Sequence, residues 1–209
     1  ILLLKSVGNF ARALDETAIL LSRSEDPVYR LVQADLLAAL GRHEEALASY
    51  ENMVREELGS KNDLDTLGLV IGKYRRYLMS RLPAESATGR FLSIVSRDVN
   101  VASLLETARL YEDLNNEAEA RAWYYRAYRT DYLSGGLAYA RFLLAHGEDR
   151  ECEKVMLYIL SNVKKGDDLI HVASAVLDEP GGMYQLKRLT DQLVKRLEEL
   201  GIGRPSTYA

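Results

Sequence analysis

Small residues recur along this chain at intervals of thirty-odd residues, each inside a segment that reads as a helix. They fall at spacings of 33, 41, 33 and 32 residues: Ala13, Ala46, Ala87, Ala120 and Cys152. A larger residue follows each of them four positions later, on the same helix face. Two helices approach closely only where neither side chain is bulky, so each small residue predicts the crossing point of a helical hairpin. Such a period is typical of a stacked helical array.

The composition favours helix over sheet. The chain has 209 residues, of which 47% are hydrophobic, so it is too apolar for disorder and long enough to bury a continuous core. It contains only four prolines and three phenylalanines, and leucine, alanine, glutamate and arginine are its common residues. The expected fold class is all-α. A formal charge of −4 disfavours a general phosphate-binding surface, so nucleic acid is not the expected partner.

Residues for catalysis or for a cofactor are not apparent. The single cysteine excludes an internal disulfide and a cysteine-only zinc site, and its place in the repeat predicts a packing residue and not a reactive thiol. The three histidines, His43, His146 and His171, have no second ligand at metal-binding spacing. No glycine-rich phosphate loop or nucleophile elbow occurs. The sequence therefore predicts no enzyme, no cofactor and no metal site.

The compartment is not readable from the sequence. No apolar run reaches the roughly 18 residues of a membrane span. The chain opens at Ile1 in "ILLLKSV" and not at Met, which suggests an excised fragment or a processed form. A cytoplasmic location is the default, and a periplasmic or secreted one stays open.

Three segments resemble the tetratricopeptide repeat (TPR) superfamily. In "ADLLAALGRHEEALASYENMV" Ala34, Gly41, Ala46 and Tyr50 fall at that family's spacing. The segment "ARLYEDLNNEAEARAWYYRAY" matches with Asn115 where glycine is usual, and "ARFLLAHGEDRECEKVMLYIL" is the third match. Asparagine tolerates the left-handed turn conformation better than most residues, so Asn115 fits the turn. The family's early tryptophan and most of its unit-ending prolines are missing.

The resemblance implies a right-handed superhelix of antiparallel helix hairpins in a single domain, 1–200, followed by a tail, 201–209. A half unit at 1–23 comes first, and the hairpins are expected at about 27–58, 63–97, 101–132, 134–163 and 167–200.

In this superfamily the first helix of each hairpin lines a concave groove, and a residue eleven positions before the small residue faces it. Counting back gives the predicted groove residues: Asp35, Arg76, Arg109 and Arg141. Arginines in successive hairpins suit acidic side chains or a peptide's terminal carboxylate, which they bind through forked hydrogen bonds.

Two alternatives to this groove stay open. The arginines are equally suited to pairing with local acids such as Glu106, Glu112 or Asp113. In the longer second hairpin, Arg75 or Tyr74 is an alternative to Arg76 at the groove position. The family's clamp for acidic chaperone tails is disfavoured, because it needs lysine and asparagine and the corresponding residues in the first hairpin are Leu31 and Asp35.

The block "WYYRAYRTDY", residues 123–132, combines aromatic residues with arginines, a composition that suits base stacking. Tyr124, however, falls on the repeated packing stripe, which favours a core role for the block. Tyr125, Tyr132 and the arginines remain as an exposed partner patch.

The end of the chain, "LVKRLEELGIGRPSTYA", separately resembles a segment of bacterial type IA DNA topoisomerases. That family's metal-binding and catalytic-tyrosine motifs have no counterpart here, so no catalytic residue follows from it.

The expected function is a non-catalytic scaffold or adaptor that binds a protein or peptide in its groove. One alternative is an accessory module of a DNA-handling protein, based on the tail and the tyrosine–arginine block. The other is a subunit that assembles or anchors a secretion or envelope complex by self-association, based on the open "ILLLKSV" edge.

Overall fold

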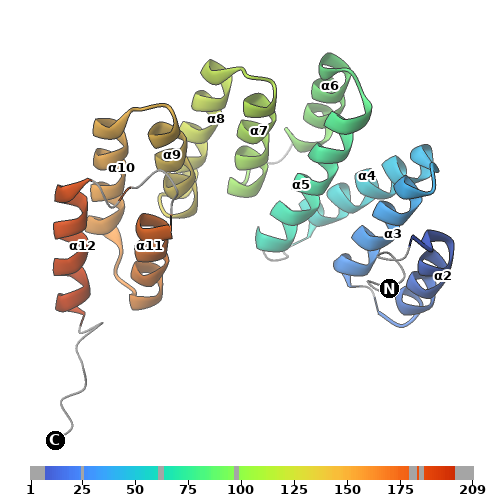
Figure 1. Cartoon of the computed structure of the whole chain (residues 1–209), viewed down its shortest axis with the longest axis horizontal. Helices are drawn as coiled ribbons and strands as arrows, with labels where there is room; N and C mark the ends of the chain where they lie inside the picture. Colours follow the sequence, from blue (N-terminus) through green and yellow to red (C-terminus); the bar gives the residue numbers. More distant parts are fainter. Residues whose placement is uncertain are drawn as a thin grey trace, which may run out of the picture. The chain divides into compact units, whose positions relative to one another are not determined.

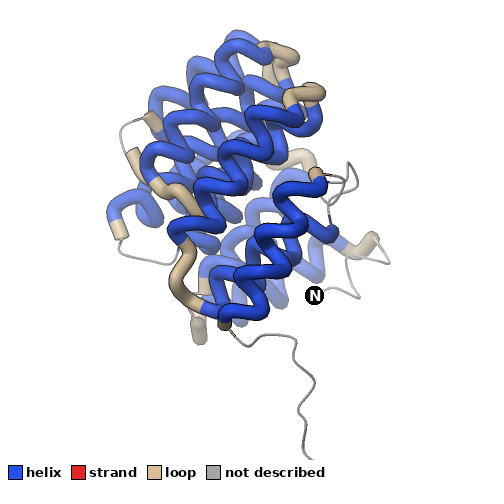
Figure 2. The backbone as a smooth tube through the Cα atoms, turned by 90° about the vertical axis from the view of Figure 1, so that its left-hand side faces the viewer, coloured by secondary structure: helices blue, strands red, loops and turns tan. Residues whose placement is uncertain are grey.

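Helices joined by short turns make up the regular structure of this protein. The structure is a computed structural model, and it describes residues 8–24, 26–60, 64–96, 99–178, 183 and 186–200. Every regular element within these ranges is helical (Figure 2). The predicted all-α class is confirmed.

The chain divides into two compact units, Ile1–Leu114 and Asn115–Ala209, and each is described by itself. The N-terminal unit contains α2 (Phe10–Leu21), α3 (Pro27–Ala39), α4 (His43–Gly59), α5 (Leu64–Arg81), α6 (Ala84–Val95) and α7 (Val101–Asp113) (Figure 1). The C-terminal unit contains α8 (Glu117–Thr130), α9 (Ser134–Ala145), α10 (Asp149–Asn162), α11 (Gly166–Asp178) and α12 (Lys187–Glu199). The sequence predicted one domain, and the boundary between the units falls inside the hairpin predicted at 101–132. The right-handed superhelix of the whole array stays a prediction.

The repeated small residues lie at fully buried positions. Each of the five has an exposed fraction of 0%: Ala13, Ala46, Ala87, Ala120 and Cys152. The residues four positions later are buried too: Thr17, Tyr50, Phe91, Tyr124 and Met156. Burial raises the pKa of the Cys152 thiol to about 12, so that it remains a neutral, unreactive thiol. The packing stripe and the structural role of Cys152 are confirmed.

Left-handed residues follow the ends of three helices, α3, α7 and α9. Gly41, Asn115 and Gly147 have φ angles of 77°, 53° and 73°. In the first of these turns the amide of Arg42 donates to the carbonyl of Leu37 at 2.9 Å, which closes the end of α3. Asn115 is the one non-glycine residue with positive φ among the described residues, and its predicted turn conformation is confirmed.

Each unit has its own apolar core. In the N-terminal unit, side chains of α3 to α7 surround three buried rings, those of Tyr50, Tyr74 and Phe91. In the C-terminal unit, side chains of α9 to α12 form the core. Helix α12 packs on α10 through Leu189 and Leu193, which are buried as the leucine stripe of this helix predicts.

Candidate protein-binding surface

Three of the four predicted groove residues lie in the N-terminal unit. Asp35 is half-buried on α3, whereas Arg76 on α5 and Arg109 on α7 are exposed. Arg141 is exposed on α9 of the C-terminal unit. Helix α5 packs against both α3 and α7, so the first three residues lie on neighbouring helices of one unit, whereas Arg141 belongs to the other unit.

The carboxylate of Asp35 is bound within the protein. The Tyr50 hydroxyl donates a hydrogen bond to it from α4, and Lys73 Nζ on α5 lies 2.9 Å from Asp35 Oδ2. The Tyr50 ring also contacts the Tyr77 ring of α5, with 5.0 Å between centroids. Asp35 thus holds α5 against α3 and α4.

A second acid, Glu51 of α4, forms a hydrogen bond with Tyr74, the next residue of α5. Glu51 is buried, and it accepts a hydrogen bond from the Tyr74 hydroxyl at 3.1 Å. Arg90 of α6 and Arg55 of α4 donate to the same carboxylate at 2.5 and 3.2 Å. Burial alone would raise the pKa of Glu51, but these hydrogen bonds and the charge of Arg90 outweigh it and hold the pKa below its ordinary value.

This lowered pKa predicts acid sensitivity of the N-terminal unit. The ionised Glu51 carboxylate stabilises the unit fully above its unfolded-state pKa of about 4.3, and this stabilisation is lost as the pH falls through the lower folded-state pKa. We expect Glu51→Gln to destabilise at neutral pH by about 1–3 kcal/mol, the range for buried charge-assisted hydrogen bonds, and to flatten the pH dependence below about pH 5. Urea unfolding followed by circular dichroism at several pH values measures both effects.

The matched control is Glu85→Gln, because Glu85 is an exposed acid of α6 with no ion pair among the described residues. It removes the same charge and should keep the wild-type pH profile. Parallel profiles for Glu51→Gln and the wild type would contradict the prediction.

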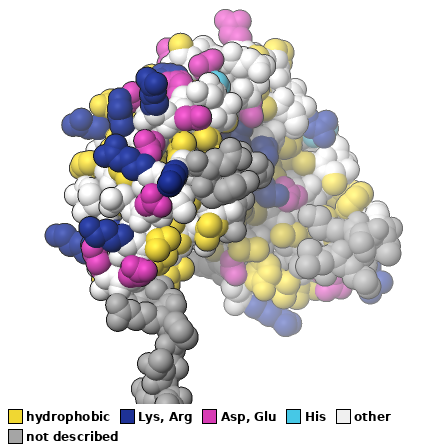
Figure 3. Space-filling model, turned by 60° about the vertical axis from the view of Figure 1, so that its left-hand side comes forward, with side chains coloured by type: hydrophobic (Ala, Val, Ile, Leu, Met, Phe, Trp, Pro, Cys, Tyr) yellow, Lys and Arg dark blue, Asp and Glu magenta, His cyan; other side chains and the backbone are white. Residues whose placement is uncertain are grey.

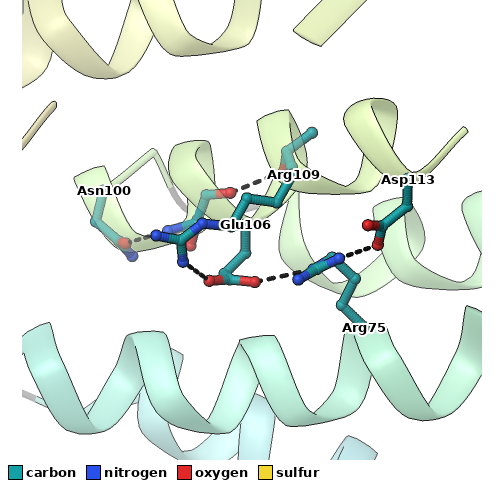
Figure 4. Close-up of polar contacts among 7 residues, drawn as sticks. Arg75, Asn100, Glu106, Arg109 and Asp113 are labelled. Carbon is teal, nitrogen blue, oxygen red and sulfur yellow. Dashed lines mark hydrogen bonds and ion pairs between the residues drawn. The ribbon is translucent and has the colours of Figure 1, made fainter. Parts of the chain in front are cut away.

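A third acid, Glu106 of α7, holds Arg75 of α5. Both side chains are buried, with exposed fractions of 3% and 7%, and Arg75 Nε lies 3.0 Å from Glu106 Oε2 (Figure 4). Arg75 Nη1 also pairs with Asp113, and Arg109 pairs with Glu106 from one turn further along α7. Gly72 of α5 leaves room for this carboxylate, since a Cβ there would lie 3.1 Å from Glu106 Oε2.

These contacts fix the rotation of α5 about its axis. Three successive residues, Lys73, Tyr74 and Arg75, reach acids on three different helices: α3, α4 and α7. The next residue, Arg76, is exposed and forms no ion pair with any described residue. Of the three alternatives at the groove position, Tyr74 and Arg75 are buried and Arg76 faces solvent.

A pocket lies between the start of α4 and the end of α5, and Tyr77, the residue after Arg76, is part of its lining. Its volume is about 300 Å³, and its lining combines three leucines with polar side chains: His43, Glu44, Leu47, Tyr77, Leu78, Arg81 and Leu82. The Tyr77 hydroxyl donates to the His43 carbonyl at 3.1 Å, which joins its two walls. Arg81 is exposed and has no ion pair among the described residues. We call Lys73, Arg76, Tyr77 and Arg81 the α5 surface.

A larger opening, of about 670 Å³, lies between α2, α3 and α4. The arginine in its lining, Arg30, pairs with Glu56 of the same lining, so its cation is already neutralised. It therefore offers less to an anionic ligand than the α5 surface does.

Arg109 pairs with a nearby acid of the protein, which was the alternative to its role as a groove residue. Arg109 pairs with Glu106 on its own helix, so a substitution there would disturb the buried Arg75–Glu106 pair as well as the surface. The sequence analysis named Glu106 as an acid partner for arginines but did not pair it with Arg75, and it missed the contacts of Glu51 altogether. The spacing of charged residues gave no signal for these contacts, because the partners are 23 to 39 positions apart.

The aromatic block of α8 is divided between core and surface. Tyr124 is buried against Phe142, with 5.1 Å between ring centroids, which confirms its packing role. Trp123 is half-buried beneath the Arg126 guanidinium, 4.3 Å from the ring centroid. Tyr125 and Tyr132 are exposed.

A metal site, a membrane-spanning helix or a uniformly charged face would each indicate another function. In the described part of the chain, no group of three or more His, Cys, Asp or Glu side chains lies together as a metal site. No described helix has the length and apolar character needed to cross a membrane. On the face shown in Figure 3, basic and acidic side chains are interspersed. The "ILLLKSV" edge and the tail 201–209 lie outside the described residues.

Comparisons with known proteins give similarity to solved structures only. No model of a known protein family matches the sequence, and no curated protein matches it. The chain is similar to TTC0263, a thermophilic TPR protein of Thermus thermophilus, with 20% identity, a TM-score of 0.46 and coverage of 84% of this chain and 95% of that chain. It is also similar to BtubC (BKLC) from P. vanneervenii, with 16% identity, a TM-score of 0.42 and coverage of 98% and 94%. The partner of this chain therefore has to be inferred from its own side chains.

Proposed function

We propose that this protein is a non-catalytic scaffold or adaptor that binds an acidic segment of another protein on its α5 surface. The observation that carries the proposal is that successive residues of α5 have different roles, some in packing and one at the surface. Lys73, Tyr74 and Arg75 hold the helix in place, whereas Arg76 takes part in no ion pair within the described protein. Stacking of the hairpins does not require Arg76, so it is available to a partner.

The chemistry of the α5 surface suits a segment that has an apolar residue next to acidic ones. The leucines of the pocket would receive the apolar side chain, and a pocket of about 300 Å³ has room for one. Arg76 and Arg81 would then pair with flanking carboxylates, and a guanidinium can do so through two parallel hydrogen bonds. The separate contacts of Asp35, Glu51 and Glu106 hold α5 in place, which lowers the entropy lost on binding.

Panning a phage-displayed random peptide library against the full chain tests this function. We expect the enriched peptides to carry acidic residues beside a large apolar residue. The double variant Arg76→Glu, Arg81→Glu should weaken binding of these peptides at least about tenfold, because it turns two attractive charges into repulsive ones. Its unfolding transition should stay close to that of the wild type, since both arginines are exposed.

The matched control is Arg12→Glu, Arg23→Glu, which changes the net charge of the same unit by the same amount at exposed positions outside the α5 surface. An equal loss in this control, or enrichment of neutral or basic peptides, would count against the proposal. Arg141→Glu in a separate variant asks whether the C-terminal unit contributes to binding, as the predicted groove requires.

A further inference from the structure

Four tyrosines from three helices meet on the C-terminal unit, and neither the packing stripe nor the proposed function uses them. Tyr125 and Tyr128 come from α8, Tyr139 from α9 and Tyr158 from α10. Tyr128 lies in the centre, with its ring centroid 6.2 Å from Tyr125, 6.0 Å from Tyr139 and 6.0 Å from Tyr158. We call these four residues the tyrosine cluster.

The tyrosine cluster joins the core to the surface: Tyr128 and Tyr139 are partly buried and pack against the core, and Tyr125 and Tyr158 are exposed. Tyr158 is 51% exposed and Tyr125 is 46% exposed, unlike the buried core residues of α10. These two exposed aromatic side chains, on α8 and α10, form with the partly exposed Tyr128 and Tyr139 a patch of the kind found at binding sites.

Three of the four hydroxyl groups of the cluster are available as hydrogen-bond donors, and the fourth, that of Tyr139, accepts a hydrogen bond from Arg121. Tyr125, Tyr128 and Tyr158 have no hydrogen-bond partner for their hydroxyls among the described residues. Burial is the main cause that raises the pKa of Tyr128 and of Tyr139 above the ordinary value of about 10. A neighbouring cation, Arg129, is exposed, lies near Tyr128 and has no ion pair among the described residues.

We propose that the tyrosine cluster binds a proline-rich segment in the polyproline II conformation, with an acidic residue beside the prolines. A run of prolines presents carbonyl acceptors and no N–H groups, so it matches a surface that offers hydroxyl donors. Proline rings pack on aromatic side chains, as in other aromatic-lined sites for such segments. The acidic residue would pair with Arg129.

The spacing of the rings fits this ligand. The two exposed tyrosines, Tyr125 and Tyr158, each contact Tyr128, at 6.2 and 6.0 Å between ring centroids, so their own rings are at most about 12 Å apart. A polyproline II helix repeats every three residues over about 9 Å, so adjacent turns of one segment can reach both outer rings. The segment is already extended before it binds, so little conformational entropy is lost.

Stacking of nucleic-acid bases suits the cluster less well. Bases need free ring faces, but the Tyr128 and Tyr139 rings are stacked on each other at an interplanar angle of 24°, and Tyr158 meets Tyr128 edge-on at 89°. The neighbouring Arg121 already pairs with Glu148 and Glu117, which leaves few cations for phosphates.

Fluorescence anisotropy on the full chain tests the proposal, with a labelled peptide of two aspartates followed by about nine prolines, three turns of the helix. We expect saturable binding. The variant Tyr125→Phe, Tyr158→Phe keeps the rings and should weaken binding about fivefold for each hydroxyl, the equivalent of one neutral hydrogen bond apiece. Arg129→Gln should weaken binding of this peptide and leave binding of an all-proline peptide unchanged.

Tyr132→Phe is the matched control, because Tyr132 is exposed on the same unit but makes no ring contact with the cluster. It should bind like the wild type, and so should Arg76→Glu, Arg81→Glu, which separates this test from that of the α5 surface. Absence of binding, or equal affinity of the double phenylalanine variant and the wild type, would overturn the proposal. So would tighter binding of a labelled oligothymidine to the same tyrosines, or a dimer in light scattering that Tyr125→Ala, Tyr158→Ala dissociates.

Discussion

Replacing Gly135 with alanine is expected to destabilise the C-terminal unit by at least about 3 kcal/mol, because α8 and α9 are in backbone contact at this residue. A Cβ at Gly135 would lie 2.2 Å from the carbonyl oxygen of Ala127 and 2.7 Å from the amide nitrogen of Tyr128. Backbone atoms cannot rotate out of the way, so the two helices would have to separate. Since domains of this kind are marginally stable, such a loss is a large part of the total.

The neighbouring Gly136→Ala variant should be milder. Its Cβ would approach the tips of two side chains, Ile159 Cδ1 at 2.9 Å and Tyr128 Cδ2 at 3.0 Å, and these can shift. Gly89→Ala on α6 is the control for helix propensity, because nothing lies within 4 Å of its Cβ position. It should stabilise the protein by about 0.5–1 kcal/mol. Urea unfolding by circular dichroism ranks the three variants, and equal stability of the Gly135 and Gly136 variants would refute the close contact.

Removing the carboxylate of Glu106 is the second change with a large expected effect. Glu106→Leu leaves the buried guanidinium of Arg75 with Asp113 as its remaining acid partner among the described residues. Breaking one side of a buried ion pair costs about 3–5 kcal/mol, and the remaining Asp113 contact places this case near the lower end. The free energy of unfolding, from urea titration at neutral pH, measures the loss.

The double variant Arg75→Met, Glu106→Leu should recover much of this stability, since it removes the uncompensated charge and fills the space with apolar atoms. A double-mutant cycle with the two single variants gives the coupling energy between the residues. Glu151→Gln is the control, because Glu151 and Lys154 form an exposed pair on α10, and no measurable change is expected there. Additive effects of Arg75→Met and Glu106→Leu would show that the pair is not coupled.

The fold was readable from the sequence wherever the signal was local. The recurring small residue, the larger residue four positions later and the left-handed turn at Gly41, Asn115 and Gly147 each follow from the size or backbone freedom of a single side chain. Pro27 is another example, since it opens α3 behind the capping side chain of Asp26.

Some close contacts were not predicted from the sequence because they join residues on different helices. The hairpin predicted at 134–163 places Gly135 and Gly136 at the start of its first helix, as the structure does, but nothing in the sequence indicated their close contact with α8. Likewise, Tyr125, Tyr128, Tyr139 and Tyr158 appear as scattered tyrosines, and only the packing of α8, α9 and α10 gathers them into one cluster.

The sequence by itself determined that this protein is a series of helical hairpins, because helix periodicity and the size of the residue at each crossing are properties of short segments. It could not determine which of Tyr74, Arg75 and Arg76 faces solvent. That was decided by acids on α3, α4 and α7, which fix the rotation of α5 from distant positions in the chain. The rotation of a helix is set by all the helices around it, and the available binding surface exists only once they are packed.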